Sequence, residues 1–216
     1  MMDAESVKRL FVACPVRGPA VEGAITDAWK RATELLPPGC ASSREEDPHM
    51  TLRFLGATDL GDTGKREAVE ALMAELRETA CRTERIPLIL GYLATFPGLL
   101  WVGVGGTVEA LDALNRLQGL VDRAVMRHGW GSADYSFLPH ITVGRFDRKA
   151  TDLLRGSLMD VDYPEHVEFD LAGLELQESV RDAGGKVEYV PVFDPASFRN
   201  VETAGDAAAA LPWTGL

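Results

Sequence analysis

One short phrase occurs in both halves of this chain and constrains its fold more than any other feature. It reads Pro-His-Met-Thr-Leu at residues 48–52 and Pro-His-Ile-Thr-Val at residues 139–143. The chain has four histidines, and two of them begin this phrase. In each half a strand pattern, a helical pattern and a loop precede the phrase. The sequence therefore predicts two related halves produced by an internal duplication.

Each phrase predicts a strand with one polar and one apolar face. Side chains at positions i and i+2 of a strand lie on the same face. His49, Thr51 and Arg53 should therefore share one face of the first strand. His140 and Thr142 should share one face of the second, with apolar residues on its reverse. If the halves pack about a pseudo-twofold axis, both polar faces line one central cleft.

Hydrophobic periodicity elsewhere predicts an α+β fold with antiparallel or mixed sheets, because several strands are joined by turns too short for a parallel crossover. The predicted strands are residues 8–16, 49–58, 86–96, 99–106, 140–146, 167–179 and 186–193, the last two flanking a turn at 182–185. The predicted helices are residues 20–36, 62–80, 107–127 and 150–158. Residues 1–194 are expected to form a single domain, and residues 195–216 a flexible tail.

Composition limits the classes of partner. Twenty-two basic and 33 acidic residues give a net charge of −11, which argues against broad coating of nucleic acid but allows the grip of one phosphate. Three cysteines without a C-x-x-C pair favour a reducing cytoplasm over a disulfide framework or a thiolate zinc site. The N-terminal segment lacks signal-peptide features. No run approaches the ~18 apolar residues of a membrane span, and no obligate protein partner is evident.

The polar faces of the two strands predict a definite chemistry. Two imidazoles that face one site form an acid–base pair near neutral pH. Two hydroxyls and a guanidinium form a cradle for a tetrahedral anion. Together these groups suit the cleavage of a phosphodiester without a metal ion or any other cofactor.

The sequence also resembles a known family. H-M-T-L and H-I-T-V resemble the paired H-x-[ST]-x signatures of the 2H phosphoesterase superfamily. RLFVACPV, HMTLRFLG, LLWVGV and PHITVGR, with a Gly-Gly turn near the end, resemble its bacterial and archaeal RNA 2′,3′-cyclic phosphodiesterases, first described as 2′-5′ RNA ligases. The resemblance covers about residues 8–194 and leaves the acidic loop 44–47 unmatched. It implies a bilobal fold with a central cleft between two related sheets, flanked by helices.

The resemblance also implies roles for single residues. It implies that a terminal 2′,3′-cyclic phosphate of RNA is opened to a 2′-phosphate. His49 would be the proton donor and His140 the proton acceptor. Thr51 and Thr142 would bind the non-bridging phosphate oxygens. Arg145 would stabilise the charge of the phosphorane.

The two candidate arginines differ in their position along the strands. Arg145 lies five residues after His140, so a flat strand would aim it at the opposite face. A bulge or bend near Gly144 would re-aim it. Arg53 has the required parity without a bulge and is the second candidate for phosphate binding.

Other functions stay open. The same site would serve 2′-5′ RNA ligation, with a 5′-hydroxyl in place of water, or a cyclic phosphodiesterase acting on a small nucleotide. A non-catalytic module that binds RNA ends is a different class, as is a metallohydrolase. Trp130, Tyr135 and Phe137 precede the second phrase and would allow stacking on a terminal base, although ordinary packing explains them as well. The expected partner is an RNA 3′ end or a small nucleotide that carries a 2′,3′-cyclic phosphate.

Overall fold

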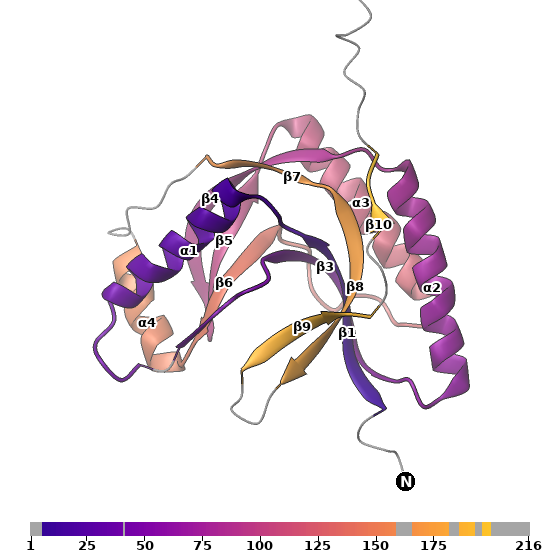
Figure 1. Ribbon diagram of the computed structural model, residues 1–216, viewed down its shortest axis with the longest axis horizontal. Coiled ribbons are helices and arrows are strands. Elements are labelled where there is room, and N and C mark those ends of the chain that lie inside the picture. Colours follow the sequence, from indigo (N-terminus) through magenta and orange to yellow (C-terminus); the bar gives the residue numbers. More distant parts are fainter. Residues whose placement is uncertain (1–5, 41, 159–165, 182–185, 193–195, 200–216) are drawn as a thin grey trace, which may run out of the picture.

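Two antiparallel sheets form an arch, with helices on the outer side of each (Figure 1). The computed structural model describes residues 6–40, 42–158, 166–181, 186–192 and 196–199. The first sheet has the order β10-β8-β1-β3, with β9 paired to β8. Its strands are β1 (Val7–Pro15), β3 (His49–Asp59), β8 (Gly173–Arg181), β9 (Val187–Pro191) and β10 (Ala196–Ser197).

The second sheet has the order β2-β6-β5-β4-β7. Its strands are β2 (Ser42–Arg44), β4 (Ile86–Phe96), β5 (Leu99–Gly105), β6 (His140–Phe146) and β7 (Glu168–Leu171). Neighbouring strands in both sheets run antiparallel. The predicted α+β class with two lobes is confirmed.

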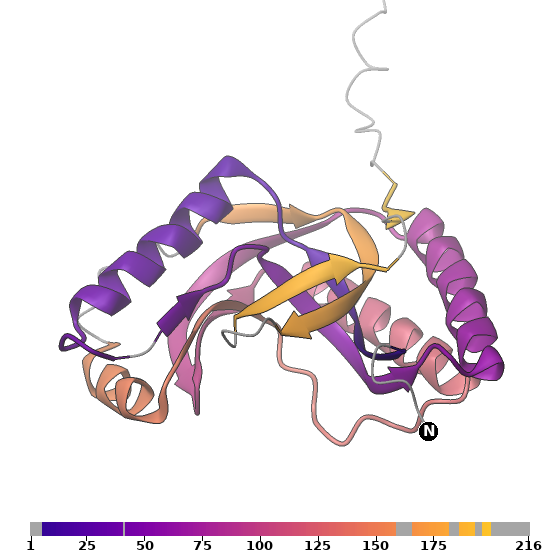
Figure 2. The same ribbon diagram turned by 60° about the horizontal axis from the view of Figure 1, so that its bottom comes forward.

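Two of the helices formed by the described residues pass from one lobe to the other (Figure 2). The helices are α1 (Pro19–Glu34), α2 (Thr63–Arg82), α3 (Val108–Arg127) and α4 (Arg148–Ser157). Helix α1 follows β1 of the first sheet but packs on β6 and β7 of the second. Helix α3 follows β5 of the second sheet and contacts both β4 of that sheet and β3 of the first. Helices α2 and α4 pack on the sheets of the strands that precede them. Each sheet is therefore covered by helices from both halves of the chain.

Three segments differ from their predicted structure. The strand predicted at residues 167–179 is two strands, β7 and β8, which lie in different sheets and are separated at Ala172. The apolar pattern runs on through this point, so periodicity does not reveal the change of sheet. The polar loop before His49 contains the short strand β2. Residues 196–199 of the predicted tail contribute β10 and the buried Phe198, while the rest of the tail and the turn at 182–185 lie outside the described residues.

An irregularity in β6 re-aims Arg145. Thr142 pairs with Trp101 of β5 and Arg145 pairs with Leu99, so the pairing skips one residue between them on β6. Leu99 and Trp101 are two residues apart on β5 and share a face. Arg145 therefore lies on the same face as Thr142, as a bulge near Gly144 was predicted to place it.

The same irregularity in β3 moves Arg53 away from that face. Thr51 pairs with Ala13 of β1, whereas Arg53 pairs with the adjacent Val12. Adjacent residues of β1 point to opposite faces, so Arg53 does not share the face of Thr51. The prediction that His49, Thr51 and Arg53 share one face is wrong for Arg53.

The position that follows the bulge in β6 accepts only glycine. A Cβ on Gly144 would overlap the indole of Trp29 on α1 and would lie 2.8 Å from the carbonyl oxygen of Ser43. The Trp29 ring also packs on Phe146, with centroids 4.8 Å apart. The close seat of α1 on the second sheet therefore depends on this glycine.

We expect Gly144→Ala to destabilise the protein by about 2–3 kcal/mol, because the helix must move to relieve the overlap. Urea denaturation followed by circular dichroism measures the change. Gly131→Ala is the matched control, since its Cβ would meet nothing within 4 Å, and it should stay within about 0.5 kcal/mol of wild type. Equal stability of both variants would contradict this account of the packing.

Candidate active site

His49 begins β3 and is enclosed by the first lobe. Its side chain is only 6% exposed. Its Nδ1 lies 2.8 Å from the carbonyl oxygen of Asp47. The ring meets the Tyr189 ring nearly edge-on, with centroids 4.5 Å apart, and lies 5.2 Å from Phe11. These contacts leave the imidazole one fixed orientation.

His140 begins β6 and is held by the same kind of hydrogen bond as His49. Its Nδ1 lies 2.8 Å from the carbonyl oxygen of Leu138, again two residues earlier. A carbonyl oxygen only accepts, so Nδ1 carries the hydrogen in both histidines. The Nε2 atom of each ring is therefore the one that can exchange a proton. His140 is less buried than His49 and lies 5.5 Å from the Trp101 ring.

The two phrases meet where β3 and β6 come into contact. The pKa of His49 is lowered to about 4, mainly by burial, with further lowering by the charges of Arg145 and His140. His49 is therefore neutral at pH 7 in the free protein. His140 and Arg145 therefore lie within electrostatic range of His49, on strands that contact each other.

The threonines lie beside their histidines as predicted. Thr51 and Thr142 are partly exposed and face the same sides of their strands as His49 and His140. Within the described part of the chain, neither hydroxyl is engaged by a hydrogen bond. Both hydroxyls are thus available to a ligand.

Arg145 reaches from the second lobe to the first. Its Nη2 donates a 2.7 Å hydrogen bond to the hydroxyl of Tyr189 on β9. Its Nε is buried and has no partner among the described residues. A buried donor without a partner is costly, which marks this guanidinium as a site for an anion.

Glu45 is a site residue that sequence reasoning missed. It is 7% exposed, and its backbone N–H donates to the carbonyl of Val143, 3.0 Å away. Its carboxyl group lies beside the Tyr189 hydroxyl and within electrostatic range of Arg145. Burial raises the pKa of Glu45 to about 7, although the hydrogen bonds and Arg145 oppose the rise. The only signal in the sequence was the acidic loop 44–47, which did not show which residue points inward.

Arg53 is buried and held by hydrogen bonds to groups of the protein itself. It is 5% exposed, and its Nε donates a 2.6 Å hydrogen bond to Asp122 on α3. Its two terminal nitrogens donate to the carbonyls of Phe54 and Gly131. The bulge in β3 turns Arg53 toward α3 and leaves Phe54, which is 52% exposed, on the face that Arg53 was expected to occupy.

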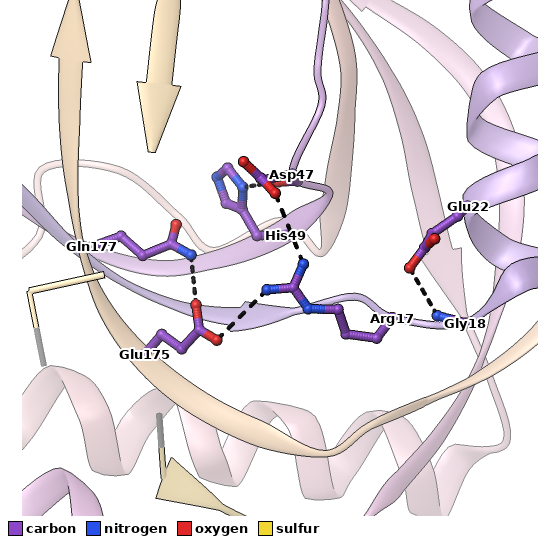
Figure 3. A network of polar contacts seen from close by, with 7 residues as sticks. All are labelled: Arg17, Gly18, Glu22, Asp47, His49, Glu175 and Gln177. Carbon is purple, nitrogen blue, oxygen red and sulfur yellow. Dashed lines mark hydrogen bonds and ion pairs between the residues drawn. The ribbon is translucent and has the colours of Figure 1, made fainter. Parts of the chain in front are cut away.

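A polar network supports the loop before His49 (Figure 3). Nη1 of Arg17 lies 3.9 Å from Oδ1 of Asp47, and its Nη2 lies 3.8 Å from Oε1 of Glu175, which is buried on β8. Gln177 donates a 2.7 Å hydrogen bond to the same carboxylate. The residue whose carbonyl orients His49 is thereby tied to the first sheet.

The described residues offer neither a metal site nor a membrane-spanning helix. No three His, Cys, Asp or Glu side chains converge there in a way that could hold a metal ion. None of the helices formed by these residues is long and apolar enough to cross a membrane.

Comparisons with known proteins agree with this fold. The sequence model of the 2′-5′ RNA ligase superfamily matches residues 19–183. E. coli LigT in complex with 3′-AMP superimposes with a TM-score of 0.63 at 20% identity, covering 89% of this chain and 98% of LigT. A structure described as a phosphoesterase gives 0.61 at 20% identity, covering 88% of this chain and 98% of that one. TT0787 of Thermus thermophilus gives 0.59 at 20% identity, with 89% and 98% covered. No curated protein sequence matches the chain.

The buried carboxyl of Glu45 should make stability depend on pH. The folded protein keeps this proton up to about pH 7, whereas an unfolded chain releases it near pH 4.5. Ionisation therefore favours the unfolded chain as the pH rises between these values. Glu45→Gln should be more stable than wild type at pH 8 by up to about 3 kcal/mol, and the difference should vanish by pH 4.5. Urea denaturation at both pH values tests this, and a difference independent of pH would contradict it.

Proposed function

Since the chain belongs to the 2′-5′ RNA ligase superfamily of 2H phosphoesterases, we propose that it hydrolyses the 2′,3′-cyclic phosphate at an RNA 3′ end to a 2′-phosphomonoester. One observation carries the proposal most strongly. Each of the two histidines is held through Nδ1 by the carbonyl two residues before it. Two rings oriented alike offer two Nε2 atoms to one substrate.

The proposed reaction uses one proton transfer at each histidine. Nε2 of His140 accepts a proton from water as the water oxygen bonds to phosphorus. The bond from phosphorus to the 3′ oxygen breaks, and Nε2 of His49 gives its proton to that oxygen. Thr51 and Thr142 donate hydrogen bonds to the non-bridging oxygens, and Arg145 stabilises the charge that develops there. Proton exchange with solvent then restores both imidazoles.

As the proposed proton donor, His49 must carry a proton on Nε2 when the leaving oxygen departs. His49 carries no proton at pH 7 on Nε2 in the free protein, because its pKa is about 4. An anion bound beside the ring favours the imidazolium. Binding of the substrate phosphate would therefore favour protonation of His49, which then protonates the leaving oxygen.

A small nucleotide is the second candidate substrate. The net charge of −11 disfavours contact with a long polyanion. LigT has been solved with 3′-AMP, NADP+ and ATP. Ligation through a 2′-5′ linkage would use the same groups with a 5′-hydroxyl as nucleophile. The three cysteines are free thiols, which supports a reducing compartment such as the cytoplasm.

Hydrolysis of a short RNA ending in a 2′,3′-cyclic phosphate tests the proposal, with EDTA present and the product phosphate located by NMR. Wild type should produce the 2′-phosphate. His49→Ala and His140→Ala should each lose at least about 100-fold in kcat, the range expected for a general acid or base. Arg66→Met, on the exposed surface of α2, is the control. Activity that survives both histidine changes would contradict the two-histidine mechanism.

NMR titration of the imidazoles tests the donor role. The pKa of His49 should start near 4 and rise by at least about one unit when 2′-AMP is bound. Chemical shifts of the ring protons report it, with His49→Ala for assignment. An unchanged pKa would reject His49 as the proton donor and would favour the opposite assignment of acid and base.

A further inference from the structure

The anion site holds a buried carboxyl group beside its guanidinium. Tyr189 lies beside both groups: its hydroxyl accepts a 2.7 Å hydrogen bond from Nη2 of Arg145 and is close to the carboxyl of Glu45. A carboxylate is an unusual neighbour for a phosphate, because the two repel each other at short range. Glu45 is ionised above its pKa of about 7, and its charge then subtracts from the positive charge that Arg145 offers to a substrate.

Each element around Glu45 contributes a defined group. Arg145 faces it from β6 and Tyr189 from β9. Asp47, in the same loop, adds a like charge, and His49 on β3 is neutral at pH 7. Near this site an ion pair joins Glu46 to Lys186 at 3.1 Å, with both side chains exposed. Solvent screens that pair, whereas Glu45 is enclosed with the guanidinium.

We propose that Glu45 sets the charge preference of the site, so that a phosphodiester monoanion is accepted and a phosphomonoester dianion is released. The inference rests on the proposed function and extends it to product release. A cyclic phosphate carries one negative charge, and the monoester left by hydrolysis carries nearly two above its second pKa of about 6. The repulsion from Glu45 doubles when the charge doubles. Opening the ring thus converts an accepted ligand into a disfavoured one at the same phosphorus.

The test compares two substitutions that remove the same charge from adjacent positions. Calorimetry at pH 8 measures the Kd of 2′-AMP for wild type, Glu45→Gln and Glu46→Gln. Glu45→Gln should bind 2′-AMP roughly tenfold more tightly, and its KM for 2′,3′-cyclic AMP should fall only about threefold, because the diester carries half the charge. Glu46→Gln should match wild type within about twofold, because its charge is exposed and paired.

Three results would overturn the proposal: no tighter binding of 2′-AMP by Glu45→Gln, an equal gain by Glu46→Gln, or an equal gain for both ligands. If Glu45→Gln does not fold, wild type is measured alone. The ratio of the inhibition constant of 2′-AMP to the KM of the cyclic nucleotide should then rise between pH 7 and pH 9, and a constant ratio would reject the idea. Absence of any hydrolysis would reject the proposed function, whereas the calorimetric comparison of 2′-AMP would still decide the role of Glu45.

Discussion

The irregularity that follows each His-x-Thr phrase is the constraint on which the site depends. In both motif strands the pairing skips a residue after the threonine, so the fifth residue after each histidine returns to the face of that histidine. In the second lobe this residue is Arg145, which reaches the site. In the first lobe it is Phe54, and Arg53 is turned to Asp122 on α3. The same irregularity, present in both strands, thus directs the Arg145 guanidinium into the candidate site in one lobe and Arg53 toward a helix in the other.

This irregularity also separates what the sequence could predict from what it could not. The shared faces of each histidine and its threonine follow from local alternation and are confirmed. The directions in which Arg53 and Arg145 point depend on the pairing with neighbouring strands, and a single sequence does not contain this pairing. The same holds for Glu45, whose inward direction comes from pairing of its backbone with β6. The division of residues 167–179 between two sheets leaves no break in the apolar pattern.

Two buried titratable groups of the site oppose each other in their effect on stability. His49 has a lowered pKa, so its contribution is lost as the pH falls from about 6.5 to about 4. Glu45 has a raised pKa, so its contribution is lost as the pH rises from about 4.5 to about 7. Where these ranges overlap, the two slopes have opposite sign and largely cancel. The enclosed site thereby tolerates two desolvated groups without one steep dependence of folding on pH.

The crossing of α1 is one of several passages of the chain between the two sheets. After β1 in the first sheet, α1 and β2 lie in the second lobe, and β3 returns to the first sheet. Near the other end of the chain, β7 completes the second sheet and β8 then pairs with β1 in the first. Neither lobe is therefore built from one continuous stretch of the chain. No single cut of the chain would release one lobe intact from the other, although each lobe carries one of the two histidines.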